Sequence, residues 1–364
     1  MPRRRIAVDA SRANASVKTG TEWHSHEVIS AMARVEERSS LVLYDRAGST
    51  FATLSQIDER RVIRLPRLWT HVGLSFAMLR DRPDALFVPS HVVPLVHPEA
   101  SVVTIHDLGY RFEPGSHRRS ARLMLEIATR WNARSAKRII AISGQTRDDL
   151  CREYKVNPSS VTVVHSGLNH ERFRPSSPEP VLGQLRLSQP YILFLSTVQP
   201  RKNLLRLVEA FEAIDRDDLS LVVAGRPGWL SVDIEERLSG GPKASRITRL
   251  GYVRDDLVPA LYSGAEAFVL PSLYEGFGFG ILEAMACGCP VVTSDRSSMP
   301  EVAGGAAILV DPTDVSSIRA GIERAMLPKE RARLVDAGLR RAAAFTWDRT
   351  ARETLAVIEQ AMMR

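Results

Sequence analysis

Cysteine is scarce in this chain of 364 residues, and no long apolar run interrupts it. Three cysteines cannot build the disulfide framework typical of small secreted domains. Cys287 and Cys289 lack neighbouring His or Cys partners, so we expect buried structural thiols and no metal site. No apolar stretch reaches the roughly 20 residues that a membrane-crossing helix needs. These absences predict a protein of a reducing, cytoplasmic compartment.

The basic N-terminus is compatible with the start of a secretion signal, but an apolar core is missing. Ile6-Ala7-Val8 is followed at once by Asp9, so we expect a first β-strand here. Internal repeats and low-complexity tracts are also absent. The length therefore predicts two ordinary globular domains.

The net charge of +7 is unevenly distributed along the chain. Residues 1–180 contain 27 Lys and Arg against 19 Asp and Glu, a balance of +8, whereas the remainder has 22 against 23, a balance of −1. A basic first half suggests an anionic partner such as a membrane surface, a lipid phosphate or nucleic acid; a scattered, solvated surface is the alternative. Because the arginines are dispersed and no basic aromatic platform is present, we expect no nucleic acid partner. A gel-shift assay tests whether the chain binds nucleic acid.

Short apolar runs alternate with helical patterns through most of the chain, which indicates parallel sheets covered on both faces. Six runs precede residue 175: Ile6–Val8, Leu41–Leu43, Ala85–Val88, Val102–Ile105, Arg138–Ile142 and Val161–Val164. Six follow residue 190: Ile192–Leu195, Leu221–Ala224, Ile247–Leu250, Ala267–Leu270, Val291–Thr293 and Ala307–Val310. We therefore expect an α/β protein with two doubly wound, Rossmann-like domains.

The expected domain boundaries follow from a proline-rich stretch, Phe173–Pro180. The prediction is a first domain over 1–174, a linker over 175–190 and a second domain over 191–346. Helical patterns cover Lys329–Ala344 and Trp347–Met363 at the end of the chain. The C-terminal helix, 347–364, is expected to return to the first domain.

A glycine-rich loop follows the run Ala267–Leu270, with a helix expected to begin near Ile281. Glycines let a ligand approach backbone N–H groups, and a helix N-terminus favours a phosphate. Glu275 in the loop and Glu283 in the expected first turn can each accept hydrogen bonds from adjacent sugar hydroxyls. The structural alternative is a tight turn with a Glu that complements the helix dipole; the presence of both acids favours a ligand.

A second cluster, Ser196–Asn203, follows the run Ile192–Leu195. Asn203 is expected to cap the helix Leu204–Ile214, which brings Arg201 and Lys202 to its positive end. Two cations there repel each other unless an anion joins them, so a diphosphate is the natural ligand. Two solvated surface cations are the alternative.

His106 ends a first-domain strand and is followed by Asp107, which is able to orient its ring. Gly20 and Thr21 open a helix that runs to Arg34 and form a further phosphate-loop candidate. A lone His-Asp pair is more often structural than catalytic, and one glycine is a weak signal.

Taken together, these segments resemble the retaining glycosyltransferases of family 4, which have the GT-B fold. The resemblance rests on the Glu-x7-Glu pattern from Glu275 to Glu283, the Arg201-Lys202-Asn203 segment, the Gly251-Tyr252-Val253 segment and the stretch Val161–Pro175. It covers essentially the whole chain. Within this family, the chain resembles bacterial mannosyltransferases of polysaccharide biosynthesis.

The resemblance implies roles for single residues. Arg201 and Lys202 would hold the donor diphosphate, Glu283 the ribose, Glu275 the transferred sugar, and His106 would contact that sugar near the reacting centre. The donor-binding residues implied are Gly20, Thr21, Thr197, Arg201, Lys202, Tyr252, Val253, Glu275, Gly276, Phe277, Gly278, Phe279 and Glu283, and the catalytic ones are His106, Glu275, Arg201 and Lys202.

The expected activity is transfer of a hexose from a nucleotide diphosphate sugar, GDP-mannose as first choice, to a glycan or a polyprenyl-phosphate-linked acceptor at the inner membrane face. No carboxylate is a convincing nucleophile, so front-face attack with retention is expected. The lack of an Asp-x-Asp motif predicts independence from metal, and no cofactor is expected. A nucleotide-sugar epimerase of the same architecture remains the alternative.

Overall fold

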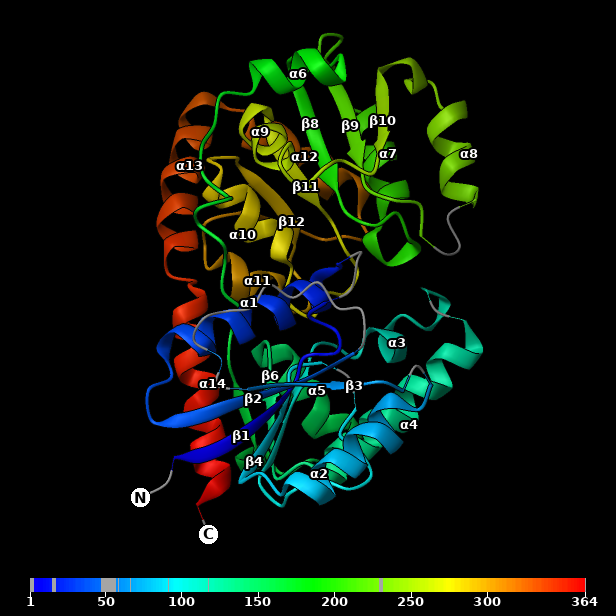
Figure 1. Cartoon of the computed structure of the whole chain (residues 1–364). Coiled ribbons are helices and arrows are strands. Elements are labelled where there is room, and N and C mark those ends of the chain that lie inside the picture. Colours follow the sequence, from blue (N-terminus) through cyan, green and yellow to red (C-terminus); the bar gives the residue numbers. More distant parts are fainter. Residues whose placement is uncertain are drawn as a thin grey trace. The chain divides into compact units, whose positions relative to one another are not determined.

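The structure is a computed structural model that describes residues 3–14, 18–46, 57, 59–65, 67–90, 92–116, 118–228 and 232–363 (Figure 1). The chain divides into two compact units. The first lies within Met1–Leu108, Ser120–Gly167 and Phe345–Arg364, and the second comprises Gly109–Arg119 and Leu168–Ala344.

These units differ in detail from the expected domains. Residues 175–190, expected as a linker, lie in the second unit and contain the helix α6 (Glu179–Leu185), which packs against α9 (Val258–Gly264). Gly109–Arg119 also belongs to the second unit, although it was expected in the first domain. Neither feature has a signal in the local pattern, because both depend on contacts with distant residues.

The first unit contains a parallel sheet in the order β3-β2-β1-β4-β5-β6-β7. Its strands are β1 (Arg4–Asp9), β2 (Ser39–Arg46), β3 (Glu59–Ile63), β4 (Ala85–Val88), β5 (Ser101–Ile105), β6 (Arg138–Ala141) and β7 (Val161–Val163). Its helical segments are α1 (Gly20–Val35), η1 (Trp69–Leu74), α2 (Ser75–Asp81), α4 (Arg119–Ser135), α5 (Gly144–Tyr154), η3 (Pro158–Ser160) and α14 (Trp347–Met362). The strand β3 was not predicted, because this edge strand begins Glu-Arg-Arg and pairs with β2 alone.

The second unit contains a parallel sheet in the order β10-β9-β8-β11-β12-β13, with all six strands where the sequence predicts them. The strands are β8 (Tyr191–Leu195), β9 (Ser220–Ala224), β10 (Ile247–Gly251), β11 (Ala267–Leu270), β12 (Val291–Ser294) and β13 (Ile308–Val310). The remaining helical segments are α3 (Gly109–Phe112), η2 (Pro114–Ser116), η4 (Pro200–Lys202), α7 (Leu204–Glu212), α8 (Val232–Gly240), η5 (Ala244–Arg246), α10 (Phe279–Ala286), α11 (Met299–Ala303), α12 (Val315–Ala325) and α13 (Pro328–Ala343).

Each sheet reverses its strand order once, and this determines where a ligand is able to bind. The reversal lies between β1 and β4 in the first unit and between β8 and β11 in the second. At such a switch point the following loops diverge and leave a crevice beyond the carboxyl ends of the strands. The loops after β8 and β11 are the two that carry Arg201-Lys202 and Glu275.

The C-terminal helix α14 belongs to the first unit, which confirms the predicted return of this helix. It packs against α1 and against β4, β5 and β6, and Figure 1 shows the red helix beside the blue α1. Thr346 caps α14 by accepting a hydrogen bond from the Arg349 N–H. A side chain at Gly167 would place its Cβ 2.3 Å from the Trp347 nitrogen, so only glycine permits this approach of the chain to α14. The predicted fold class, with two Rossmann-like domains, is thus confirmed.

Candidate active site

The loop after β8 forms one wall of the candidate site in the second unit. Gln199 is followed by the short 3₁₀ turn η4, and Asn203 then adopts a left-handed conformation with φ +60°. The predicted cap by Asn203 is wrong, because its side chain makes no capping bond to α7. Its amide instead donates to the carbonyls of Pro271 at 2.9 Å and Pro312 at 2.6 Å. Asn203 therefore ties the β8 loop to the loops that follow β11 and β13.

The loop after β11 forms the other wall. The Leu273 N–H donates to the Arg201 carbonyl at 2.9 Å, and the Ser298 hydroxyl donates to the carbonyls of Glu275 and Phe277 at 2.8 and 3.1 Å. Gly278 has φ +94°, a conformation that favours glycine, and α10 begins directly after it. The helix starts at Phe279, two residues before the predicted Ile281, so Glu283 lies in its second turn and not in its first.

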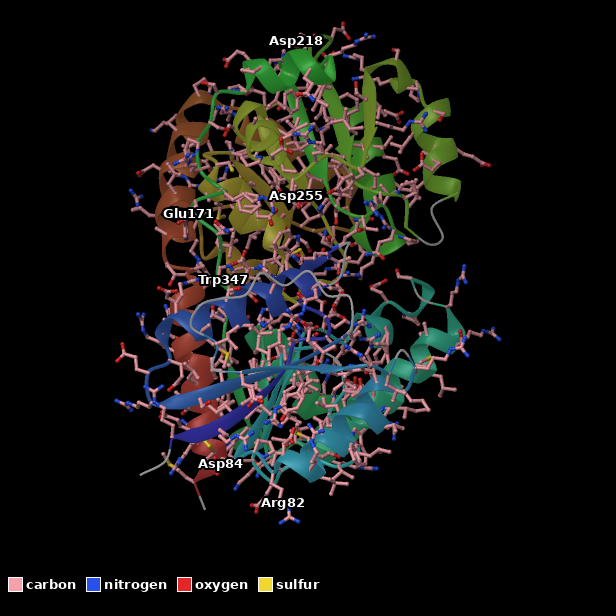
Figure 2. The ribbon with its side chains drawn as sticks, in the orientation of Figure 1. Arg82, Asp84, Glu171, Asp218, Asp255 and Trp347 are labelled. Atoms are coloured by element: carbon pink, nitrogen blue, oxygen red, sulfur yellow. The ribbon has the colours of Figure 1, made fainter. Side chains whose placement is uncertain are left out.

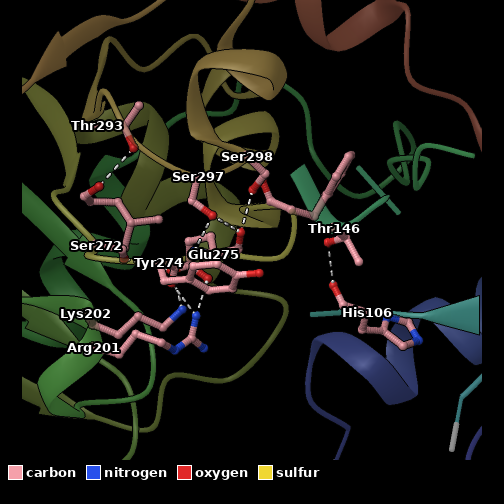
Figure 3. Close-up of polar contacts among 12 residues, drawn as sticks. His106, Thr146, Arg201, Lys202, Ser272, Tyr274, Glu275, Thr293, Ser297 and Ser298 are labelled. Atoms are coloured by element: carbon pink, nitrogen blue, oxygen red, sulfur yellow. Dashed lines mark hydrogen bonds and ion pairs between the residues drawn. The ribbon is translucent and has the colours of Figure 1, made fainter. Parts of the chain in front are cut away.

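Glu275, Arg201 and Lys202 form a buried ionic cluster between the two loops (Figure 3). Glu275 Oε2 lies 3.0 Å from Arg201 Nη1, and Oε1 lies 2.5 Å from Lys202 Nζ. The Ser272 hydroxyl donates to Oε1 at 2.7 Å, and Arg201 also donates to the Tyr274 carbonyl. The sequence thus predicted three residues that the fold brings into direct contact.

The charge states in this cluster follow from its geometry. Burial acts to raise the pKa of the Glu275 carboxyl, but Lys202, Arg201 and the Ser272 hydroxyl together lower it to about 2. Glu275 is therefore ionised at neutral pH and serves as a counter-ion to both cations. Phosphate oxygens form strong charge-assisted hydrogen bonds with Arg and Lys, so the two cations give the cluster the character of an anion site.

Glu283 occupies a different environment from Glu275. The Tyr262 hydroxyl donates to its Oε2 at 3.1 Å. Burial raises the pKa of the Glu283 carboxyl, while the positive charge of Arg172 acts in the opposite direction. The described ion pairs of the cluster do not include Glu283. The two acids of the Glu-x7-Glu pattern are thus held by separate partners.

The predicted base-binding residues follow β10. The Tyr252 side chain is 55% exposed, and the Arg226 guanidinium lies 4.3 Å from its ring centroid, whereas Val253 is buried. Arg226 was not predicted; in the sequence it is marked only as a cation two residues after the end of β9. Backbone hydrogen bonds join the Arg226 segment to the β8 loop, where Thr197 is exposed. Gln199 is buried there, and its Oε1 has no hydrogen-bond partner in the described structure.

A segment from the first half of the chain also reaches this site. Phe112, at the end of α3, stacks on Tyr274 with ring centroids 5.3 Å apart. Burial raises the pKa of the neighbouring Glu113 carboxyl, and Arg201 acts against that rise. Neither residue was predicted, because only the tertiary structure assigns Gly109–Arg119 to the second unit.

His106 and the Gly20-Thr21 pair belong to the first unit. His106 Nε2 lies 2.9 Å from the Pro89 carbonyl oxygen, and because a carbonyl only accepts, Nε2 carries the hydrogen. The Pro89 carbonyl therefore orients the ring by hydrogen bonding, and the charge of Asp107 acts to raise the pKa of His106. Burial lowers the pKa of His106, which keeps its ring neutral at pH 7.

The buried His24 was missed by the sequence analysis. Its ring packs edge-on against His106 at 4.8 Å, and its Nδ1 lies 2.9 Å from the Ser166 hydroxyl. Gly20 is the first residue of α1, which Thr19 and Glu22 cap reciprocally.

Three observations concern metals, thiols and membranes. Within the described parts of the chain, no three His, Cys, Asp or Glu side chains group as metal ligands. Cys287 and Cys289 are buried and unpaired. A search of the described helices finds none with the length and apolar character to span a bilayer.

Comparison with known proteins places these features in context. Residues 19–172 match the family described as Glycosyltransferase Family 4, and residues 189–327 match the family described as Glycosyl transferases group 1. An O-antigen chain mannosyltransferase B of Escherichia coli is 32% identical over 344 residues, which cover 92% of this chain and 88% of that protein.

Solved structures show the same fold at low sequence identity. The sucrose-phosphate synthase of Thermosynechococcus elongatus superposes with a TM-score of 0.78 at 21% identity, covering 98% of this chain and 99% of that one. HepE of Anabaena, solved with UDP-glucose, gives 0.74 at 16% identity, covering 98% and 99%. None of these three proteins is an epimerase, so that alternative receives no support.

Proposed function

The chain belongs to glycosyltransferase family 4, and we propose that it moves a hexose from a nucleotide diphosphate sugar to a glycan or lipid-linked acceptor with retention of configuration. The observation that carries this proposal is the ionic cluster of Arg201, Lys202 and Glu275 at the switch point of the second sheet. Its two cations match the charge of a diphosphate, and its carboxylate is able to accept hydrogen bonds from sugar hydroxyls.

Donor binding would rearrange the pairs within this cluster. A diphosphate competes with Glu275 for Arg201 and Lys202, since phosphate oxygens form strong charge-assisted bonds with both cations. The Glu275 carboxylate then becomes available to accept hydrogen bonds from the transferred sugar. In this proposal the acid serves as an internal counter-ion until the donor arrives.

The remaining residues would bind the rest of the donor. We propose that Tyr252 and Val253 contact the base, that Thr197 on the adjoining loop contacts the donor, and that Glu283 binds the ribose. The backbone of Gly276, Phe277, Gly278 and Phe279 would approach the sugar and phosphate. We propose that Gly20 and Thr21 close over the diphosphate. We also propose that His106 contacts the donor sugar through its unprotonated Nδ1.

The chemical problem is departure of a nucleotide diphosphate from the anomeric carbon. Negative charge grows on the phosphate as the bond breaks, and Arg201 and Lys202 would stabilise it there. The acceptor hydroxyl attacks from the same face, and the departing phosphate takes its proton. We propose that no metal takes part, so activity should survive EDTA. Loss with EDTA and recovery with Mn²⁺ contradicts this part.

The donor and the acceptor are proposed from different observations. Similarity to the O-antigen chain mannosyltransferase B favours mannose as the transferred sugar, and we propose GDP as its carrier. The charge excess in the first half of the chain favours an acceptor linked to polyprenyl phosphate, with the protein peripheral on the cytoplasmic membrane face.

The test replaces single members of the cluster. In Lys202→Met the side chain keeps its length and loses its charge, and we expect the transfer rate to fall about 10²- to 10³-fold. Arg254→Gln, which breaks an exposed ion pair with Asp256 in the same unit, is the control and should leave the rate unchanged. A wild-type rate in both Lys202→Met and Glu275→Gln refutes the assignment.

A further inference from the structure

A stripe of exposed apolar side chains runs along η1 and α2 in the first unit. Leu68, Val72, Phe76 and Leu79 are 69%, 51%, 65% and 57% exposed. Leu68 directly precedes η1, Val72 lies in η1, and Phe76 and Leu79 lie on one face of α2 at a spacing of three residues. The opposite face buries Trp69, Leu74, Ala77 and Met78. This helical segment is therefore apolar on both sides, and only one side meets the core.

The N-terminal half of α4 exposes a second apolar group. Leu123, Met124 and Ile127 are 61%, 72% and 59% exposed. The C-terminal half of this helix is anchored in the unit, because the Trp131 Nε1 donates to the Val93 carbonyl and the Val93 N–H donates to Asn132 Oδ1.

The segment Val93–Val96 joins the two apolar groups. Its Val93 end is bonded to α4, and the Val96 N–H donates to the Ser75 hydroxyl at the start of α2, at 3.1 Å. Leu95, between these anchors, is 58% exposed. Of the 16 exposed large apolar side chains in the described structure, 11 lie between residues 62 and 127. We call this surface of α2, residues 93–96 and α4 the apolar face.

Arginines surround the apolar face. Arg64, Arg67 and Arg82 are exposed along η1 and α2, and Figure 2 shows Arg82 at the edge of the unit. Arg130 is exposed on α4. The acids on these helices are already engaged: Asp81 pairs with Arg61 and Arg80, and Glu126 with Arg130 and the Tyr154 hydroxyl. The rim is thus positively charged.

We propose that the apolar face docks the first unit on an anionic lipid surface. Large contiguous apolar patches are rare on proteins that stay in water, so this face calls for an apolar partner. Acyl chains accept the Leu, Phe, Met and Ile side chains, and anionic headgroups bind the surrounding arginines. The inference deepens the proposed action on a lipid-linked acceptor and rests on it, since docking would bring this unit to the acceptor.

The test is flotation with vesicles of phosphatidylcholine alone or mixed with phosphatidylglycerol. The wild-type chain should float with the anionic vesicles, and binding should fall when NaCl rises from about 0.1 M to about 0.5 M. The double variants Phe76→Ser with Leu79→Ser, and Met124→Ser with Ile127→Ser, should each lower the partition coefficient at least about tenfold. Arg64→Gln and Arg67→Gln should lower it about fivefold each.

The matched control is Leu309→Ser with Leu327→Ser, which removes apolar side chains of the second unit that are 43% and 58% exposed. It should float like the wild-type chain. The inference is refuted if the wild-type chain does not bind anionic vesicles, if the control loses binding equally, or if the face variants instead abolish a dimer in sedimentation. Transfer to a polyprenyl-phosphate-linked acceptor and to a soluble glycan acceptor is measured in parallel, and only the loss of both counts as absence of transfer. Vesicle binding without transfer refutes the proposed function alone, and transfer without vesicle binding refutes the docking alone.

Discussion

At the scale of single residues, the chemistry of this protein is concentrated in Glu275. The carboxylate is buried, yet two cations and a hydroxyl keep it ionised. A glutamine of the same shape would leave Arg201 and Lys202 without their counter-ion, as protonation of the acid does. The pH dependence of folding therefore reports directly on this cluster.

We predict that Glu275→Gln destabilises the folded state at neutral pH. Because the pKa falls from 4.5 unfolded to about 2 folded, ionised Glu275 contributes about 3 kcal/mol above pH 4.5, and this is lost as pH falls through 2. Denaturant unfolding at a series of pH values should show that the difference in the free energy of unfolding between wild type and variant shrinks below pH 4. The control Asp218→Asn breaks an exposed ion pair with Arg216, and its free energy of unfolding should differ little from that of the wild type at any pH. A gap that is constant with pH contradicts the ionic account.

At the scale of elements, two close contacts determine how distant segments meet. Asn203 joins the β8 loop to Pro271 and Pro312, so the cations are held against the loop that carries Glu275. In the first unit, Gly167 lets the chain approach the start of α14 closely enough for that helix to cover β4, β5 and β6.

Replacement of Gly167 by Ala is expected to destabilise the first unit by about 1–3 kcal/mol. The new Cβ would lie 2.3 Å from the Trp347 nitrogen and 2.5 Å from the Thr346 carbonyl carbon, and backbone atoms cannot rotate away. Chemical denaturation of Gly167→Ala and of the control Gly183→Ala measures the change in the free energy of unfolding. Gly183 lies in α6 with nothing within 4 Å of its Cβ position, so alanine there should be neutral or stabilising. Equal stability of both variants contradicts the close-packing argument.

At the scale of the whole molecule, the two units carry different surfaces. The cluster that would bind the donor and the exposed Tyr252–Arg226 pair lie in the second unit. The excess of positive charge and the apolar face lie in the first half of the chain. This division matches a transferase that takes a water-soluble donor and a membrane-linked acceptor.

Donor identity is testable on the intact chain by thermal shift. A nucleotide that binds only the folded state adds RT ln(1 + [L]/Kd), about 2.7 kcal/mol at a hundredfold excess over Kd. We expect GDP and GDP-mannose to raise Tm more than UDP or ADP and their sugars. In Lys202→Met the shift should shrink, since a contact to the diphosphate is lost. A larger shift with UDP than with GDP overturns the proposed donor.

The sequence by itself determined the two parallel sheets and predicted most residues of the candidate donor site. Buried parallel strands read as short apolar runs, and twelve such runs reappear as strands. Because parallel strands deliver their following loops to one edge, Arg201, Lys202 and Glu275 were predictable at the same edge of the second sheet. The edge strand β3 escaped because charged residues compose much of it.

Only the tertiary structure decided the contacts between segments far apart in the sequence. The pairing of Glu275 with both cations, the role of Asn203 as a donor to two carbonyls, and the arrival of Phe112 beside Tyr274 have no local pattern. The exposure of Phe76 and Met124 also has no local pattern, because the sequence alone does not show whether an apolar side chain faces the core or solvent. Periodicity encodes which face a residue lies on, but packing decides what covers that face.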